Sequence, residues 1–328
     1  MLDLLGIGNA IVDTDVEVDD SFLQQESLLK GQMTLIDSAR MTQLVGSLGQ
    51  RTMRRRSGGS AANTIYAAQA FGLNTSYACQ LADDENGRHF FRERQDAGIV
   101  TSQISAMNDE QRSGQCLVLV TPDAQRTMCT DLGVSKDFSY ARVNESDLRA
   151  AKCLYIEGYL SASELSSQSA ARSAALANAS STQVALTLSD ISMIEFCRDG
   201  LSAIMGDGVD TLFCNADEAT AWAKTDRLDI AINELKDIAK ELYVTLGSEG
   251  AEVCNIEGRW QVGGESVLAV DTNGAGDMFA GACLAARLQG AGAIDAARFA
   301  NRAAARVITQ FGARLPSLTD YQLLRATE

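Results

Sequence analysis

Residues 271–277 read Asp-Thr-Asn-Gly-Ala-Gly-Asp, and an apolar run of small residues, 278–283, follows directly. Three small residues, Gly274, Ala275 and Gly276, allow the backbone to turn tightly and to aim successive N–H groups outward. The run after them reads as a helix, whose positive N-terminal end would add to that field. The stretch therefore predicts an anion hole. A carboxylate at its mouth, that of Asp277, predicts a general base for phosphoryl transfer.

A plainer interpretation of the same stretch is an ordinary helix start. Asp271 or Asp277 would then cap free backbone amides, and the glycines would only form the turn. Motifs elsewhere in the sequence distinguish these two interpretations.

The pattern Asp-Thr-x-Gly-Ala-Gly-Asp is the C-terminal signature of the ribokinase-like, or PfkB, family of carbohydrate and nucleoside kinases, and the chain resembles that family. A second family motif, Gly-Gly-Ser-Ala-Ala-Asn-Thr, lies at residues 58–64. Two separated motifs in the expected order extend the resemblance over nearly the whole chain. It implies an ATP-dependent kinase in which Asp277 is the base, the Gly274–Gly276 amides stabilise the γ-phosphoryl group and Mg²⁺ bridges the phosphates. Dependence on a monovalent cation stays open.

Composition and charge narrow the class of protein. The 328 residues are 46% hydrophobic, enough for a large core, and 43 acidic against 28 basic residues give a formal net charge of −15. Such an acidic chain argues against nucleic acid or an anionic membrane as a partner. The start carries no basic segment, and no uncharged apolar run is long enough to cross a bilayer, so we expect a cytoplasmic protein. The one basic cluster, residues 51–56, is expected to be a solvated face, with a role in steering anions left open.

Cysteine and histidine usage argues against a metal cage. The eight cysteines contain no Cys-x-x-Cys pair, and His89 is the single histidine. Several cysteines sit inside apolar runs, where a free thiol behaves as a small core residue. His89 lies in a charged helical stretch and is given no catalytic role.

Short apolar runs alternate with helical stretches along most of the chain. This alternation predicts an α/β fold with a mainly parallel sheet between two layers of helices. The expected strands are 2–8, 76–81, 153–157, 184–188, 211–214 and 242–246, and the expected helices include 61–71, 87–97, 164–179 and 230–240.

Two stretches break the alternation and predict a small β-sheet. Residues 14–23 with 33–36, and 115–120 with 126–130, read as extended segments, the second pair a hairpin turning at residues 121–124. In the resembled family such insertions form a lid over the acceptor and often carry the dimer contact, which implies a homodimer through the lid. We therefore expect an α/β domain from 1–12, 37–105 and 134–328, and a lid from 13–36 and 106–133.

Strand ends supply candidate acceptor contacts, because open α/β sheets hold ligands there. Asp13 follows the first strand, and an ionised carboxylate suits two neighbouring hydroxyls because it only accepts hydrogen bonds. A turn or cap role is the alternative for Asp13, and the resemblance favours sugar binding. It also implies acceptor contacts at Gly58, Gly59 and Asn63, and an arginine, Arg126, that reaches over the phosphates when the lid closes.

Further positions resemble the nucleotide side of the family. Asn215 and Glu218 match its Asn-x-x-Glu motif, which implies that Glu218 acts on magnesium through water, although a helix cap would explain the pattern too. The turn 244–251 resembles the nucleotide loop, with Thr245 and Gly247 as phosphate-side contacts and Gly250 shaping the loop. Residues 300–305 and 311–313 resemble the adenine-side helix and turn, which makes Asn301 a candidate base contact.

The identity of the acceptor is the least determined part of the function. The chain contains neither the Walker A pattern nor the protein-kinase motifs, so the phosphate site depends on residues 274–277. Its motifs look closer to the adenosine-kinase branch than to ribokinase, which favours a ribonucleoside such as adenosine over a free sugar. A catalytically idle sugar- or nucleotide-binding protein is the alternative of another class. Five apolar residues of the expected lid could cover a base or could pack the lid itself: Met33, Leu35, Leu117, Leu119 and Met128.

Overall fold

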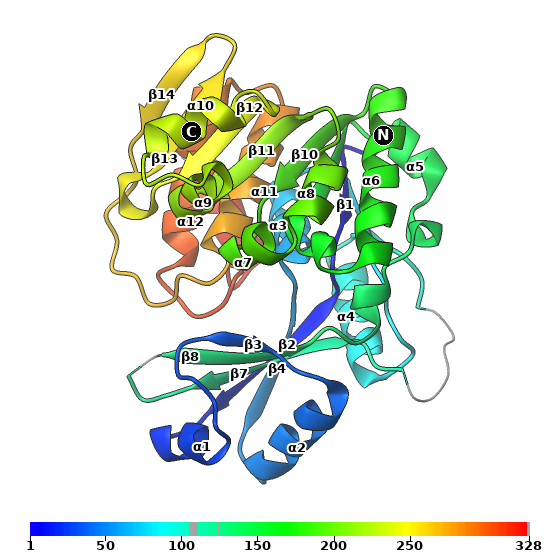
Figure 1. Cartoon of the computed structure of the whole chain (residues 1–328), viewed down its shortest axis with the longest axis vertical. Helices are drawn as coiled ribbons and strands as arrows, with labels where there is room; N and C mark the ends of the chain where they lie inside the picture. The colour runs from blue at the N-terminus through cyan, green and yellow to red at the C-terminus, as the bar shows by residue number, and fades with distance from the viewer. Residues whose placement is uncertain (105–110, 124, 327–328) are drawn as a thin grey trace.

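Nine strands form one sheet in the order β14-β13-β12-β11-β10-β9-β1-β5-β6 (Figure 1). The computed structural model describes residues 1–104, 111–123 and 125–326. From β12 to β6 all neighbouring strands run parallel, whereas β13 and β14 join antiparallel at one edge. The predicted mainly parallel sheet is confirmed. Its strands are β1 (Leu4–Ile7), β5 (Thr75–Ala78), β6 (Val100–Thr101), β9 (Cys153–Glu157), β10 (Gln183–Thr187), β11 (Val209–Asn215), β12 (Ala239–Thr245), β13 (Ala251–Asn255) and β14 (Gly258–Val262).

Helices cover both faces of this sheet and bury a separate apolar cluster on each. One face is covered by α3 (Ser60–Ala70), α4 (Glu85–Asp96), α11 (Ala275–Leu288), α12 (Ala293–Val307) and α13 (Leu318–Ala326). The other is covered by α5 (Glu145–Ala150), α6 (Glu164–Ala179), α7 (Ile191–Phe196), α8 (Arg198–Met205), α9 (Ala216–Ala223) and α10 (Leu228–Leu235). The expected three-layer α/β/α architecture is confirmed. Short 3₁₀ helices lie at η1 (Gly133–Asp137), η2 (Tyr140–Arg142), η3 (Gly158–Ala162) and η4 (Gly247–Glu249).

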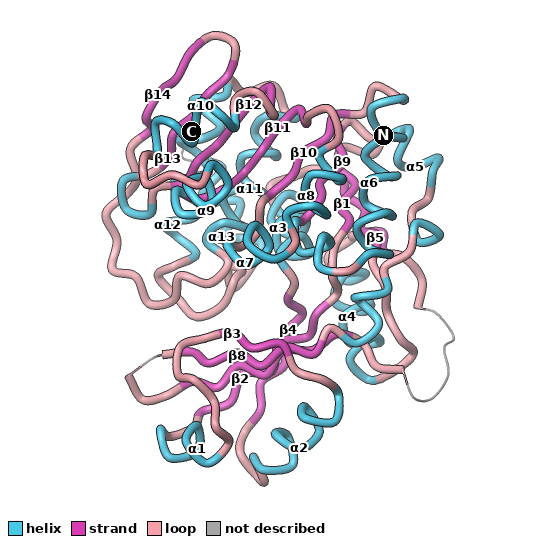
Figure 2. The backbone as a smooth tube through the Cα atoms, in the orientation of Figure 1, coloured by secondary structure: helices cyan, strands magenta, loops and turns pink. Residues whose placement is uncertain are grey.

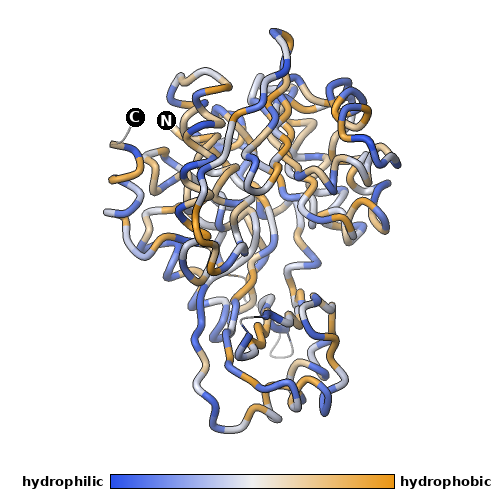
Figure 3. Tube along the Cα trace, turned by 90° about the vertical axis from the view of Figure 1, so that its left-hand side faces the viewer, coloured by the Kyte–Doolittle hydropathy of each residue, from blue (hydrophilic) through white to orange (hydrophobic). Residues whose placement is uncertain are grey.

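A second sheet of five strands, in the order β3-β8-β7-β2-β4, forms the lid below the main domain (Figures 1 and 2). Two helices pack against its outer face, where Leu117 and Leu119 share a cluster with Phe22 and Leu44. The inner face carries a smaller cluster around Val118. The side view in Figure 3 shows that only a few segments of the backbone connect the lid to the main domain. The lid elements are β2 (Ile11–Glu17), α1 (Asp20–Gln25), β3 (Met33–Leu35), α2 (Ser38–Leu48), β4 (Met53–Gly58), β7 (Gly114–Val120) and β8 (Arg126–Asp131).

The lid is larger than the expected segments 13–36 and 106–133. Both α2 and β4 belong to it, since β4 pairs with β2 and α2 packs into the outer cluster. The expected main-domain segment 37–105 therefore starts too early, and the chain enters the main domain at Gly59. Residues 105–110 and Ala124, in the expected hairpin turn, lie outside the described residues.

Two further expectations about local structure are wrong. The extended segment 14–23 ends at Glu17, because the Asp19 side chain accepts the Phe22 N–H at 2.8 Å and starts α1. The helix expected to reach residue 240 ends at Leu235, and β12 already begins at Ala239. The arginines of the run 51–56 are exposed, as expected for a solvated face, and the run continues into β4.

The cysteines behave as expected for core residues: all eight are free thiols and seven are buried. Within residues 1–104, 111–123 and 125–326, no helix has both the length and the apolar character needed to cross a membrane.

Candidate active site

Two cavities meet near the start of α11. The larger, of about 790 Å³, is lined by the ends of β10, β11 and β12 and by Gly276 and Asp277. The smaller, of about 320 Å³, lies between the lid and the main domain and is lined by Asp13, Asn63 and Arg126 among others. Asn63 Nδ2 donates to Asp277 Oδ2 at 3.1 Å, so the side chains of the two cavities touch. Asp277 therefore lies at the junction.

The signature loop forms the turn that its small residues predict. Gly274 is the N-cap of α11 with φ of 76°, and a Cβ there would lie 2.2 Å from Cβ of Ala313, so no side chain fits. A Cβ on Gly276 would meet no atom within 4 Å. The Ala275 N–H donates to the Thr272 carbonyl at 3.3 Å, whereas the N–H groups of Gly276 and Asp277 lie in the first turn of α11, where no helical carbonyl accepts them. The N–H groups of Gly276, which was among the predicted donors, and of Asp277, which was not, can therefore donate to an anion.

Asp277 does not cap α11. It is the third residue of the helix, and its carboxylate turns to α3, where it accepts from Ser60 Oγ at 2.6 Å and from Asn63. Desolvation raises the pKa of Asp277 to about 6, against the lowering effect of these two hydrogen bonds and of the Arg314 charge. A carboxylate with this pKa is ionised near neutral pH and is a better base than an exposed one.

Asp271 has a structural role in the same loop. It accepts backbone N–H groups of Asn273 at 3.1 Å and of Gly312 at 2.7 Å, which ties the signature to the turn after α12. Its Oδ2 also lies 2.8 Å from Nη2 of Arg126. The guanidinium of Arg126 stands over the ring of Phe311, at 5.7 Å. Arg126 thus lies at the boundary of lid and main domain and contacts Asp271.

Asp13 projects from β2 into the smaller cavity. An added Cβ on Gly58 would lie 2.3 Å from Oδ2 of Asp13, so only glycine leaves room for this carboxylate. Gly59 has φ of 91° and starts α3. Desolvation and the charge of Asp15 raise the pKa of Asp13 to about 7, whereas nearby arginines lower it in part. The structure thus brings together Asp13, Gly58, Gly59 and Asn63 as the two motifs predicted.

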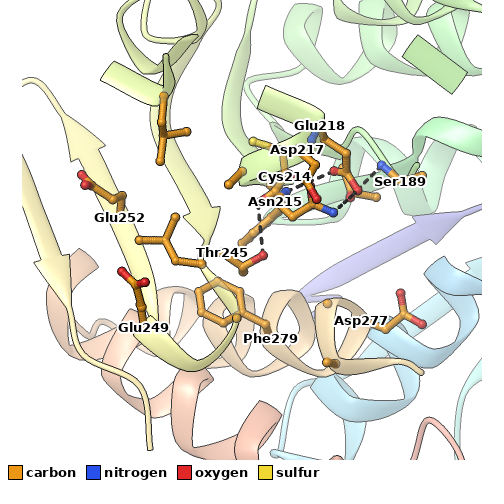
Figure 4. A pocket seen from close by; sticks show the side chains of 18 of the residues that line it. Ser189, Cys214, Asn215, Asp217, Glu218, Thr245, Glu249, Glu252, Asp277 and Phe279 are labelled. Carbon is orange, nitrogen blue, oxygen red and sulfur yellow. Dashed lines mark hydrogen bonds between the residues drawn. The ribbon is translucent and has the colours of Figure 1, made fainter. Parts of the chain in front are cut away.

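Asn215 and Glu218 form a capping box at the start of α9, and both line the larger cavity opposite Asp277 (Figure 4). Glu218 N–H donates to Asn215 Oδ1 at 2.7 Å, and Asn215 Nδ2 donates to Glu218 Oε1 at 2.7 Å. Burial, with the charges of Asp190 and Asp217, raises the pKa of Glu218 to about 7. The helix-cap interpretation is therefore correct, and the capped carboxylate still faces the cavity.

The oxygen donors here suit Mg²⁺ held through water. Among the described residues no three His, Cys, Asp or Glu side chains are grouped as a metal cage. Glu218 and Asp217 nevertheless both line the larger cavity, and the raised pKa of Glu218 means that a nearby cation would be favourable.

The expected nucleotide loop lies at the other end of the larger cavity. Thr245, the last residue of β12, and Gly247, with φ of 59°, both line it. Gly250 has φ of 93°, and a Cβ there would lie 2.1 Å from the Val262 carbonyl oxygen. Its role in shaping the loop follows from this lack of space.

Two expected adenine-side positions lie elsewhere. Asn301 is not among the residues that line the larger cavity, and its Nδ2 donates to the carbonyls of Val262 at 3.0 Å and Gly263 at 3.1 Å, so it holds the loop after β14. Phe311, Gly312 and Ala313 line the smaller cavity. Asp271 holds the backbone of this turn through the Gly312 N–H.

One site residue, Arg314, was missed by sequence reasoning. It follows the turn 311–313 and lines the smaller cavity, where Nε donates to Asn63 Oδ1 at 3.0 Å. It forms no motif with its neighbours in sequence, so nothing in the chain signals its position.

A buried carboxylate, that of Asp277, lies at the junction of two cavities and beside the open amides of a helix start, an arrangement that suits a phosphotransferase acting on a hydroxyl group. Residues 28–320 match the pfkB family of carbohydrate kinases, and the chain belongs to this family. ATP is therefore its co-substrate, and its acceptor is a small molecule.

Known relatives include both nucleoside and sugar kinases. The chain is 28% identical over 309 residues to an adenosine kinase of Saccharomyces cerevisiae, covering 88% of this chain and 89% of that protein. It is 28% identical over 282 residues to an ATP-dependent ribose-1-phosphate kinase of Halopiger xanaduensis, covering 86% and 90%. The crystal structure of adenosine kinase from Sinorhizobium meliloti is 31% identical, with a TM-score of 0.85 and 99% of each chain covered. That of a probable sugar kinase from Rhizobium etli CFN 42 is 30% identical, with a TM-score of 0.90, covering 99% of this chain and 98% of that one.

Proposed function

We propose that the protein transfers the γ-phosphoryl group of ATP to a primary hydroxyl of a ribonucleoside, with adenosine as the first candidate. The observation that carries this proposal is the position of Asp277, at the junction of the two cavities and beside the free amides of α11. ATP would occupy the larger cavity along Thr245 and Gly247. The acceptor would occupy the smaller one.

The proposed reaction uses groups whose positions suit it. Asp13 accepts hydrogen bonds from two neighbouring hydroxyls of the ribose and holds the primary hydroxyl near Asp277. Asp277 takes the hydroxyl proton as the oxygen attacks the γ-phosphorus, and the bond from that phosphorus to the β,γ-bridging oxygen breaks, which releases ADP. The N–H groups of Gly276 and Asp277 then hold the charge of the transferring group, for which they need no reorganisation.

Magnesium is the metal that this donor set fits. When bound it would neutralise phosphate charge, and Glu218 and Asn215 would hold it through water. Their capping box keeps the Glu218 carboxylate directed to the cavity before any ligand arrives.

The apolar cover for a base is smaller than the lid sequence suggested. Leu117 and Leu119 lie on the outer face of the lid sheet and cannot contact an acceptor. Val118 lines the smaller cavity instead, together with the exposed ring of Phe311. These two groups are suited to enclose a nucleobase.

The test is ATP consumption with adenosine, other ribonucleosides, ribose, ribose 1-phosphate and fructose as acceptors. We expect much higher kcat/KM for a ribonucleoside than for ribose, because a free sugar lacks the remote group whose binding closes the lid. Efficient turnover of a sugar and of no nucleoside would move the assignment to a free-sugar kinase. If no acceptor were phosphorylated, the idle binding protein would be the better interpretation.

We also propose that the lid carries a homodimer contact. The edge strand β3 leaves Met33 and Leu35 exposed, and an edge strand offers unpaired backbone groups to a partner. Sedimentation velocity should give a dimer that Leu35→Lys converts to a monomer. A monomeric wild-type protein would contradict this contact.

A further inference from the structure

Arg314 links the Asn63 amide, and through it the base Asp277, to the end of the lid strand β4. We propose that Arg314 is a positioning residue: it orients the Asn63 amide and so fixes the Asp277 carboxylate for proton transfer. The inference rests on the proposed role of Asp277 as the base.

Three donors of Arg314 are fixed by three different elements. Nε donates to Asn63 Oδ1 in α3 at 3.0 Å, Nη2 donates to the Ser57 carbonyl of β4 at 2.7 Å, and Nη1 pairs with Glu93 of α4. The guanidinium also stands over the ring of Tyr66, at 4.5 Å. Its side chain is 14% exposed, so it has little freedom to take another rotamer.

These contacts leave the Asn63 amide one orientation. An arginine only donates hydrogen bonds and an ionised carboxylate only accepts them. With Arg314 Nε on one side and Asp277 Oδ2 on the other, Oδ1 must face Arg314 and Nδ2 must face Asp277. Without Arg314 the amide could reverse and turn its oxygen to the carboxylate, which would repel it.

Glu93 in turn holds both Arg314 and Ser57. Its Oε2 accepts from the Ser57 N–H at 3.1 Å and from the Ser57 hydroxyl at 2.8 Å. Ser57 is therefore bound through its N–H and hydroxyl by Glu93 and through its carbonyl by Arg314. Because Gly58 and Gly59 follow directly, the same contacts fix the turn beside Asp13.

Arg314 is also the cation that acts on Asp277 and Asp13 together. The Asp277 charge itself raises the pKa values of Glu157 and Tyr155 of β9 and of Tyr159 of η3, and none of these three groups is positive. Removing Arg314 should therefore make Asp277 harder to ionise. A residue that only supported the fold would not move this titration.

The first experiment compares Arg314→Gln with Arg306→Gln, an exposed arginine on α12 that bonds to Thr309 away from the cavities. We expect Arg314→Gln to lower kcat by about 10- to 100-fold while the ATP KM stays within about twofold. The acid limb of its kcat/KM profile should move up by about one pH unit. Arg306→Gln should match the wild-type protein in kcat, in the ATP KM and in the pH of the acid limb.

Two conservative variants separate charge from geometry. Arg314→Lys keeps the positive charge but loses the planar guanidinium that donates to three acceptors at once. The acid limb of its kcat/KM profile should therefore match that of the wild-type protein, whereas its kcat should stay low. Glu93→Gln keeps an acceptor of the same shape and leaves the Arg314 charge uncompensated, so it should move the acid limb to lower pH. Opposite shifts in two folded variants cannot come from a general loss of structure.

The outcomes separate this inference from the proposed function. A wild-type protein that phosphorylates no acceptor would contradict the proposed function alone. An Arg314→Gln protein with wild-type kcat and an unmoved acid limb would overturn the positioning role. If that variant failed to fold, shown by its thermal unfolding, an unmoved acid limb in Glu93→Gln would overturn it instead.

Discussion

Arg126 of the lid and Asp271 of the signature loop form an ion pair across the boundary of the two domains, with 2.8 Å between Nη2 and Oδ2. Their side chains are 13% and 5% exposed. Asp271 also holds the backbone of Gly312, next to the ring over which Arg126 lies. Lid position and the shape of the signature loop are therefore coupled through one carboxylate.

We predict that breaking this pair destabilises the unliganded protein. Asp271→Asn leaves a nearly buried arginine without its counter-charge, and we expect a loss of about 2 to 4 kcal/mol in the free energy of unfolding. Urea denaturation of Asp271→Asn, Arg126→Gln and the double variant gives the coupling energy. If the two single effects simply added, the residues would not be coupled.

Asp277→Asn keeps the shape of the base and removes its proton acceptor. The variant should lower kcat by at least about a hundredfold, because general-base catalysis contributes about 10² to 10⁴. ATP affinity, measured by calorimetry, should stay largely intact since the amides of α11 are unchanged. Near-normal turnover of the purified variant would rule out Asp277 as the base.

Asp13→Ala removes the carboxylate proposed to bind the ribose hydroxyls. Loss of two charge-assisted hydrogen bonds, each about 1.5 to 3 kcal/mol, should raise the acceptor KM strongly and the ATP KM little. Steady-state kinetics with each substrate varied in turn measures both. An equal loss for ATP, or an unchanged acceptor KM, would place the acceptor elsewhere.

Buried carboxyl groups make the unliganded protein less stable as the pH rises. Asp13, Glu157 and Glu218 have pKa values raised to about 7 and Asp277 to about 6, from 3.8 or 4.5 for unburied groups. The folded state therefore binds protons more tightly than the unfolded state. The stability that these protonated carboxyl groups contribute at low pH is lost as the pH rises through their pKa values in the folded state.

Thermal unfolding of the unliganded protein should accordingly show Tm falling between about pH 5 and pH 8. Asp277→Asn should flatten this dependence, because the amide does not titrate. A Tm that rises across the same interval would mean that these carboxylates are not desolvated in solution.

Much of the fold and of the site could be predicted because the determinants are local. Gly274 turns the chain where no side chain fits, Asn215 caps the helix that carries Glu218 in its first turn, and the alternation of apolar runs specifies the parallel sheet. Each depends on residues a few positions apart. The lid strand β4 was missed because its exposed arginines hide the strand period, and its partner β2 lies far away in the sequence.

The amino-acid sequence by itself determined the family and pointed to Asp277 and Asp13 as the proposed base and acceptor anchor, since short motifs with strict steric needs carry them. Only the tertiary structure decided which groups surround them. Arg126 forms an ion pair with Asp271, and Asn301 donates to the carbonyls of Val262 and Gly263. Arg314 donates to Asn63. The physical reason is that a hydrogen-bond partner is set by distance in space and by unsatisfied donors and acceptors, and packing brings these together from remote parts of the chain.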